Sequence, residues 1–319
     1  MVKRLAVAFV LAAAAGLAGG AYPERPIRLL VPSSPGSGPD TVARILATRL
    51  SATFGQQVVA DNRAGANGVL ASETVARATP DGYTLLMTSG GHTSNPHIYR
   101  KLPYDTLADF TPITCFLTTG GLMVVATPSF AARTVPQLID LARAAPGRIA
   151  YASAGVGNLT HLAGEMFNQM AGVKLLHVPY KGGGPAIIDV IGGQVPLMFA
   201  SGPISIPHVK TGKLRALAYT GVKRFDQLPD VPTMDESGLK GYEAIGWYGL
   251  YGPARLPAPI LTRIYEATRD GVRHPEARQA FAQFNIEPAD STPAQFARFL
   301  REDLVKYGKI VKAAGIEPQ

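Results

Sequence analysis

The sequence predicts an α/β protein built as two similar lobes, each a mixed, mostly parallel sheet flanked by helices. The first observation is that apolar, strand-like runs alternate with helix-like stretches along the chain. The second is a repeated glycine turn, G-x-G-x-x-T, which begins at Gly36 and again at Gly155, each time after an apolar run and before a helix. We infer that each lobe supplies one such turn to a shared cleft.

The first part of the chain predicts strands with helices between them. Apolar residues recur every three or four positions from Asp40 to Phe54, which indicates a helix, and Pro80-Asp81-Gly82 reads as a turn. The expected strands are 27–32, 57–61 and 83–88, the expected helices are 40–54 and 68–78, a short helix starts at Asn95, and 113–127 holds one or two strands.

The second part repeats this alternation. Thr134 and Gln137 have the spacing of a capping box, and Thr292 before Pro293 is a typical helix start. We expect strands at 149–152, 175–179, 195–200, 214–219 and 242–250, helices at 134–145, 160–170, 185–191, 259–273, 275–284 and 293–314, a helical turn near 204–211, and turns over 223–241.

The two strand–turn–helix cycles also predict how the chain divides. We expect residues 22–124 together with 223–319 to form the first lobe, and residues 125–222 to form the second. The chain would leave the first lobe near Val124–Ala126 and return near Gly221–Lys223. The terminal helices would then pack on the first lobe.

The N-terminus has the pattern of a secretory signal peptide. The basic pair Lys3-Arg4 precedes an apolar run from Leu5 to Ala18, and small residues lead up to Ala21. This run is shorter than the ~20 residues that span a bilayer, which disfavours a membrane anchor. We expect residues 1–21 to be removed by cleavage near Ala21 and the remaining chain to be exported.

Composition excludes several classes of protein and site. Cys115 is the single cysteine, so an internal disulfide and a multi-cysteine metal site are excluded. The net charge is +8, but the basic residues are scattered rather than clustered among aromatic ones, so we expect no nucleic-acid partner. Neither a G-x-S-x-G nor an H-E-x-x-H motif is present, and Ser153 and His161 lack a third group, so enzyme activity is not expected.

The two glycine turns predict a site for an anion. A helix N-terminus beyond the carboxyl end of a strand presents unpaired N–H groups and partial positive charge, and glycine lets the backbone approach a ligand. A simpler reading, tight loops closed by capping side chains, stays open. A dinucleotide site is disfavoured because Thr41 and Thr160 replace its third glycine. Asp40 suits an N-cap better than a ligand contact, because a carboxylate repels an anion.

A few side chains elsewhere fall near the expected cleft. Lys181 either reaches the cleft or stays in solvent, and Tyr180 beside it is placed to stack on a ligand or donate a hydrogen bond. His92 follows a strand and is equally suited to binding a carboxylate or capping the next turn. His161 suits packing on its helix, and Trp247 suits the core.

Several longer motifs occur in an order that is specific to one family. They include "YPERPIRLLVP", "PDGYTLL", "YASAGVGNLTHLAGEMF", "HVPYKGGGPA" and "KAAGIEP", and with others they span nearly all of the chain after residue 21. The chain thereby resembles the Bug (Bordetella uptake gene) family, the substrate-binding proteins of tripartite tricarboxylate transporters. The resemblance implies the two-lobed periplasmic-binding-protein (Venus flytrap) fold, a periplasmic location, a monomer and no cofactor.

The resemblance also implies a function. A small carboxylate or an amino acid would be captured between the lobes and delivered to one large and one small integral-membrane subunit. A flytrap that signals to a membrane kinase is an alternative, and a cleft enzyme is a weaker one. The family holds its ligand mainly through backbone amides and waters of the two glycine turns.

The expected ligand-binding set joins these turns to the neighbouring candidates. It comprises Ser33, Gly36, Ser37, Gly38, Asp40, His92, Thr93, Ser153, Ala154, Gly155, Gly157, Asn158, Thr160, His161, Tyr180, Lys181, Gly182 and Ser201.

Two positions depart from the family pattern. Ser33 stands where the family usually has an aromatic residue, and Ala200–Ser201 stand where it often has an acidic or amide side chain. The loss of a carboxylate would remove a partner for a ligand ammonium group. We therefore expect a di- or tricarboxylate or an aromatic carboxylate, without an amine and bulkier than aspartate.

Overall fold

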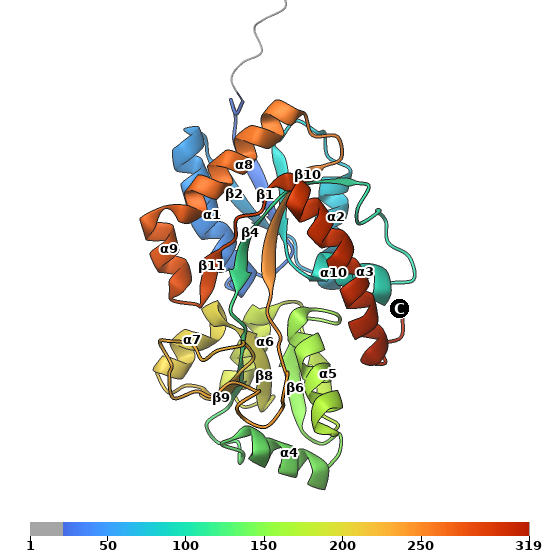
Figure 1. Cartoon of the computed structure of the whole chain (residues 1–319), viewed down its shortest axis with the longest axis vertical. Coiled ribbons are helices and arrows are strands. Elements are labelled where there is room, and N and C mark those ends of the chain that lie inside the picture. Colours follow the sequence, from blue (N-terminus) through green and yellow to red (C-terminus); the bar gives the residue numbers. More distant parts are fainter. Residues whose placement is uncertain (1–21, 319) are drawn as a thin grey trace, which may run out of the picture.

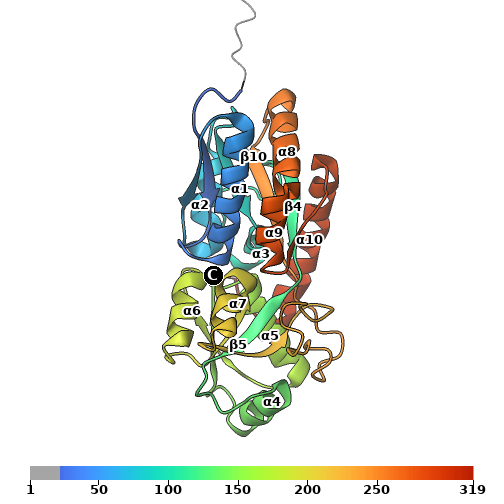
Figure 2. The ribbon, with the colours of Figure 1, turned by 90° about the vertical axis from the view of Figure 1, so that its left-hand side faces the viewer.

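The computed structural model describes residues 22–318, which fold into two lobes stacked along the long axis of the molecule (Figure 1). Figure 2 shows the same arrangement from the side, with strands β4 and β5 running in succession from one lobe to the other. The predicted signal peptide, residues 1–21, lies outside the described residues. Within 22–318, no helix combines the length and apolar character needed to cross a membrane.

The first lobe contains a six-stranded sheet in the order β11-β4-β10-β3-β1-β2. Strand β1 is parallel to both β2 and β3, while β10, β4 and β11 pair antiparallel. The strands are β1 (Ile27–Val31), β2 (Val58–Asn62), β3 (Thr84–Thr88), β4 (Phe110–Thr119), β10 (Trp247–Pro253) and β11 (Ile286–Pro288). The helices are α1 (Gly38–Phe54), the short η1 (Ala66–Gly68), α2 (Val69–Ala76), α3 (Gly91–Ile98), α8 (Ala258–Arg273), α9 (Pro275–Ala282) and α10 (Pro293–Ala313).

Strand β1 is covered on both faces, because successive side chains of a strand point in opposite directions. Leu29 belongs to a core shared with Leu46 of α1 and Ile264 of α8. Its neighbour Leu30 belongs to a second core that includes Phe296 of α10. A strand buried on both faces has a continuous apolar sequence, and for this reason the sequence predicted strand β1.

The second lobe contains a five-stranded sheet in the order β7-β6-β8-β5-β9. Strand β6 is parallel to β7 and β8, and β5 is antiparallel to β8 and β9. The elements are β5 (Leu122–Ala126), α4 (Val135–Ala144), β6 (Ala150–Ser153), α5 (Leu159–Ala171), β7 (Leu176–Pro179), α6 (Gly183–Ile191), β8 (Leu197–Ser201), α7 (Gly202–Lys210) and β9 (Arg215–Tyr219). Two mixed sheets with flanking helices confirm the predicted fold class.

The chain passes between the sheets at places other than those expected. All of β5 lies in the second sheet, so the first crossing is at Gly120–Gly121 rather than 124–126. Residues 223–244 were expected in the first lobe, yet Met234 and Tyr242 are buried in the second lobe's core. The Ala244 N–H also donates to the Thr220 carbonyl oxygen at 3.0 Å. Apolar residues in a turn-rich segment follow no regular period, so their burial was not apparent from sequence.

Helix starts agree with the sequence expectation at α10 and differ from it at α1 and α3. Thr292 caps α10 as its sequence indicated, and it also forms a complete capping box with Gln295. Helix α3 instead starts at Gly91, well before the expected Asn95, with Gly90 at its N-cap and no side-chain capping bond. This early start rotates the residues that follow β3 into the first lobe.

Candidate functional site

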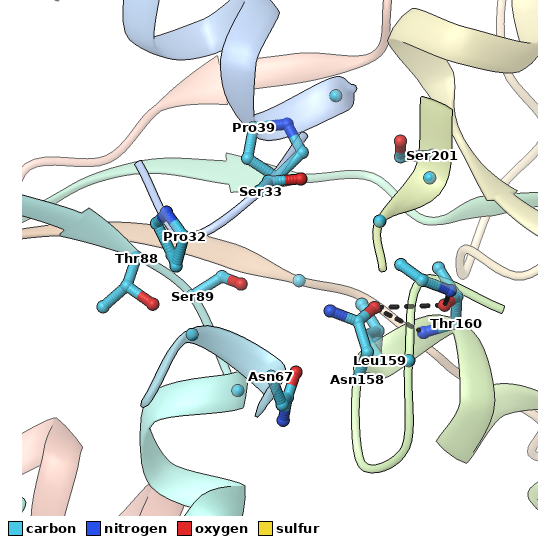
Figure 3. A pocket seen from close by; sticks show the side chains of 18 of the residues that line it. Pro32, Ser33, Pro39, Asn67, Thr88, Ser89, Asn158, Leu159, Thr160 and Ser201 are labelled. Carbon is cyan, nitrogen blue, oxygen red and sulfur yellow. Dashed lines mark hydrogen bonds between the residues drawn. The ribbon is translucent and has the colours of Figure 1, made fainter. Parts of the chain in front are cut away.

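A cavity of about 320 Å³ lies between the two lobes (Figure 3). It is lined by residues that follow the carboxyl ends of parallel strands in both sheets: Ser33 after β1, Ser89 after β3 and Ala154 after β6. Ligands of open α/β sheets bind at this end of the strands, where the chain turns into the next helix. The cleft predicted between two lobes is therefore present, and both glycine turns contribute to it.

Helix N-termini surround this cavity. The first residues of five helices line it: Gly38 of α1, Gly91 of α3, Leu159 of α5, Gly183 of α6 and Gly202 of α7. Each N-terminus carries partial positive charge and N–H groups without acceptors inside the helix. Among the lining residues of the described chain there is no Asp or Glu, so the electrostatics favour an anion.

Asn158 presents a fixed hydrogen-bond donor to the cavity. Its Oδ1 accepts from the backbone N–H and from the hydroxyl of Thr160, both at 3.1 Å. This assigns the side-chain orientation, and in Figure 3 the Asn158 amide nitrogen points away from Thr160 into the open space. The hydroxyls of Ser89 and Ser201 and the amide of Asn67 surround the same space. Together these groups can hydrogen-bond carboxylate oxygens, directly or through water.

In the first glycine turn, only part of the predicted set faces the cavity. Ser33 and Gly38 line it, whereas Gly36, Ser37 and Asp40 do not. Ser37 caps α1, and Asp40 accepts from the Gly36 N–H at 2.9 Å and from Arg44 at 3.0 Å. Burial by itself would raise the pKa of Asp40, but these bonds outweigh burial and hold the pKa below its ordinary value. Asp40 thus stabilises the turn from within the first turn of α1, and the N-cap is Ser37 rather than the expected Asp40.

The second turn is supported from behind by two stacked histidines, of which His161 is buried and His177 half-buried. Ser153 Oγ lies 2.6 Å from Nε2 of His177, whose ring stacks on that of His161 at 3.8 Å. His161 Nδ1 accepts from the Gly157 N–H at 3.0 Å. Burial lowers the pKa of His161 to about 4, and burial together with His161 lowers the pKa of His177 to about 3. Both rings are therefore neutral near pH 7.

Of the seven residues predicted to bind ligand at the second turn, four line the cavity and three do not. Ala154, Gly155, Asn158 and Thr160 face it. Ser153 is completely buried, and His161 is used within the lobe, so neither is placed to act on a bound molecule. Gly157 does not line the cavity either.

The residues after β7 lie at the cavity as expected, but the Tyr180 hydroxyl is already engaged in a hydrogen bond within the second lobe. Tyr180, Lys181 and Gly182 all line it. Tyr180 Oη donates to Asp189 at 2.6 Å, so Tyr180 offers its ring rather than its hydroxyl. Burial and this bond raise the pKa of Tyr180 to about 12. Lys181 is exposed and is the cationic side chain among the described lining residues.

His92 and Thr93 lie outside the cavity. His92 is buried among Tyr104, Phe110 and Tyr251, and its Nε2 contacts the Thr106 carbonyl oxygen at 3.0 Å. Burial lowers the pKa of His92 to about 4. Thr93 donates to Asp303 of α10 at 2.6 Å. The early start of α3 turns both side chains toward the first lobe's interior.

The lobes touch each other at glycine residues of the turns. Ser94 Oγ donates to the Gly157 carbonyl oxygen at 2.9 Å, and a side chain at Gly157 would collide with Ile98 of the first lobe. A side chain at Gly38 would likewise collide with Ser201 of the second lobe. These glycines permit close contact between the two lobes. The sequence reasoning had explained them only by the close approach of a ligand to the backbone.

Sequence reasoning missed the cavity residues contributed by distant strands. Tyr248 of β10 lines the cavity, and its hydroxyl oxygen would lie 3.7 Å from a Cβ at Gly38. Trp247 belongs to a core cluster with Phe296, as expected, but it also lines the cavity. Asn67 stands in a left-handed conformation with φ of 49°. Asn67 lies in the sequence "DNRAGANG", residues 61–68, to which the sequence reasoning assigned no binding role.

Residues 42–316 match the family model described as the tripartite tricarboxylate transporter family receptor. The chain belongs to this family. As a TctC-type receptor of the Bug group it is a solute-binding protein and not an enzyme.

Solved structures of similar sequence support this assignment. The periplasmic binding protein BugD shares 34% identity at a TM-score of 0.90, over 93% of this receptor and 100% of BugD. Rpa4515 of R. palustris, determined with adipate, shares 32% identity at a TM-score of 0.90, with 93% and 100% covered. MatC (Rpa3494) of Rhodopseudomonas palustris, with bound malate, shares 28% identity at a TM-score of 0.86, with 91% and 100% covered.

Proposed function

We propose that this receptor binds a carboxylate that carries no amino group and delivers it to a tripartite tricarboxylate transporter. The observation that carries the proposal is the cavity itself, with five helix N-termini and no acidic side chain among its described lining residues. An ammonium group would find no carboxylate partner there and would be repelled by the helix termini. The relatives determined with adipate and malate hold ligands of the proposed class.

The site supports binding through both lobes. Ser33 and Gly38 belong to the first lobe, and Asn158 and Ser201 belong to the second. A ligand that contacts both sets binds the closed arrangement more tightly than an open one, so it shifts the population toward closure. We propose that closure bends the crossings at Gly120–Gly121 and near residue 245. A large and a small membrane subunit would recognise the closed form in the periplasm, after removal of residues 1–21.

The test is a thermal-shift screen of the chain from Tyr22 onward, followed by calorimetry. The panel holds malate, adipate, citrate, terephthalate and benzoate, with aspartate and glutamate as matched amino-bearing compounds. A ligand of the folded state raises the melting temperature by mass action. We expect at least one carboxylate without an amine to stabilise the protein and the two amino acids to have no effect. Preferential stabilisation by aspartate or glutamate would overturn the proposal and favour an amino-acid receptor.

Binding without delivery would favour the sensor alternative. Gene neighbours that encode the two membrane subunits would support transport, whereas uptake that continues unchanged after deletion of this gene would contradict it. The direct measurement is uptake of the identified, radiolabelled carboxylate by cells with and without the receptor.

A further inference from the structure

One wall of the cavity is built at the junction of the two lobes. We call it the hinge wall; its residues are Thr119, Leu122, Trp247, Phe284 and Ile286. Thr119 and Leu122 flank the first crossing, and Trp247 begins the strand that follows the second. Strand pairing holds Ile286 opposite Thr119 and Trp247 opposite Thr118. The wall is therefore assembled from three segments that are far apart in sequence.

The polar groups around Thr119 in the hinge wall are already paired with one another, and the indole N–H of Trp247, which has no hydrogen-bond partner among the described residues, is buried and not exposed to the cavity. Thr119 exchanges hydrogen bonds with Gly246, each of 2.8 Å, through its N–H and its Oγ1. The Gly120 N–H donates to the Asn285 carbonyl oxygen at 2.8 Å, and Asn285 Nδ2 donates to Tyr219 Oη at 2.6 Å. A polar ligand group placed here would lose its water without gaining a partner from these groups.

Phe284 is the residue of the hinge wall that contacts the apolar cores of both lobes. It lies in the turn between α9 and β11. Met198 and Ile204, which line the cavity from the second lobe, belong to the same cluster as Phe284. The first residues of α1 and α3, Gly38 and Gly91, lie beside Ser201 and Asn67 rather than beside Phe284, whereas Gly202 of α7 lies against the Phe284 carbonyl oxygen. The cavity is therefore polar at α1 and α3 and apolar where the Phe284 side chain lies with Met198 and Ile204.

We propose that Phe284 is a specificity-determining residue: it sets the depth of the cavity and selects carboxylates with an apolar alkyl or aromatic body over hydroxylated ones of equal charge. This inference rests on the proposed function and names the ligand class more closely. The carboxylate faces the helix N-termini, and the apolar body lies against the hinge wall. Burial of that body provides the selectivity, because apolar surface is removed from water while no polar group is left unpaired.

The experiment measures dissociation constants by calorimetry for malate, adipate, suberate, benzoate and terephthalate. Wild type is compared with Phe284→Ala, which deepens the cavity, and Phe284→Leu, which retains apolar contact with both cores. The matched control is Phe130→Ala, because Phe130 is also half-buried, packs on the second lobe's core and does not line the cavity. Melting temperatures without ligand verify that all variants are folded.

We expect wild type to prefer an apolar-bodied carboxylate over malate by at least about tenfold. Phe284→Ala should weaken the wild-type favourite by about tenfold or more and move the preference toward a longer or bulkier carboxylate. Phe130→Ala should leave the order of affinities unchanged. Malate as the tightest wild-type ligand, or an unchanged order in both Phe284 variants, would overturn the inference. If no carboxylate binds wild type, the proposed function fails instead.

Discussion

The two glycine turns share one sequence pattern but adopt two different structures. In the first turn Ser37 caps α1, so the second glycine of the pattern, Gly38, is already the first helical residue. In the second turn α5 starts at Leu159 and is capped by Asn158, two positions later in the pattern. Gly157, the counterpart of Gly38, therefore stays in the loop with φ of 74°.

Side-chain chemistry explains this shift. The position that matches Ser37 is Val156, which has no oxygen to accept a hydrogen bond from the helix. The position that matches Asn158 is Pro39, which cannot cap but fits the first turn of a helix. The difference teaches that a shared glycine spacing does not define a shared turn, since the capping residue decides where the helix begins.

The largest expected effect is a difference in ligand affinity between alanine substitutions at Gly36 and at Gly157, two glycines with similar positive φ. Gly36 has φ of 73° with no atom near its missing Cβ, whereas the Cβ of a residue at Gly157 would collide with Ile98. Gly157→Ala and Gly36→Ala should each lower the free energy of unfolding by about 1 to 2 kcal/mol, because alanine disfavours this conformation. Gly157→Ala should in addition weaken binding of the best carboxylate by about 10- to 100-fold, since overpacking opposes lobe contact.

Calorimetry on both variants decides this prediction. The double variant Gly157→Ala with Ile98→Ala should recover affinity, because the colliding side chain is removed. Equal affinities for Gly36→Ala and Gly157→Ala would show that contact between the lobes at this point is unimportant for binding.

The second expected effect is a pH dependence that the second turn has and the first turn lacks. His161 contacts His177, Glu165 and the Gly157 N–H, with Tyr151 beside Glu165. In the unfolded chain the His161 side chain has a pKa of about 6.5, whereas in the folded protein its pKa is about 4. Its contribution to stability is therefore complete above pH 6.5 and is lost as the pH falls toward 4.

The measurement is denaturant unfolding at pH 7 and pH 5. In His161→Gln, whose side-chain oxygen can still accept from Gly157, the loss of stability between these pH values should be about 1 to 2 kcal/mol smaller than in wild type. The lowered pKa of Asp40 means that the first turn loses its contribution only below about pH 4. An Asp40→Asn variant should therefore keep the wild-type difference between pH 7 and pH 5; an unchanged difference in His161→Gln would contradict the prediction.

The smallest expected effect is a difference in unfolding free energy between substitutions at Thr160 and Thr41, the threonines that end the two G-x-G-x-x-T patterns. Thr160 is buried and its hydroxyl joins the Ala154 N–H to Asn158, whereas the Thr41 hydroxyl only donates to the Ser37 carbonyl oxygen. Thr160→Val should cost about 1 kcal/mol of unfolding free energy, because it leaves the half-buried Ala154 N–H without its acceptor. It should also weaken ligand binding a few-fold by releasing Asn158. Thr41→Val should cost under about 0.5 kcal/mol; comparable losses in the two variants would remove the distinction.

Much of the fold was determined by local sequence. The apolar β1 and the capping signal at Thr292 act between neighbouring residues, so pattern reasoning recovers them. The same reasoning placed both glycine turns at a cleft between lobes, because the carboxyl ends of parallel strands share one edge of a sheet.

The tertiary structure alone decided which of those residues face the cavity. His92 and Thr93 follow a strand as expected, yet the unsignalled start of α3 turns them into the first lobe. Phe284 and Tyr248 reach the cavity through antiparallel pairings between strands far apart in sequence. Local propensity determines elements and caps, but a site assembled at the junction of two lobes depends on long-range pairing, which local patterns do not encode.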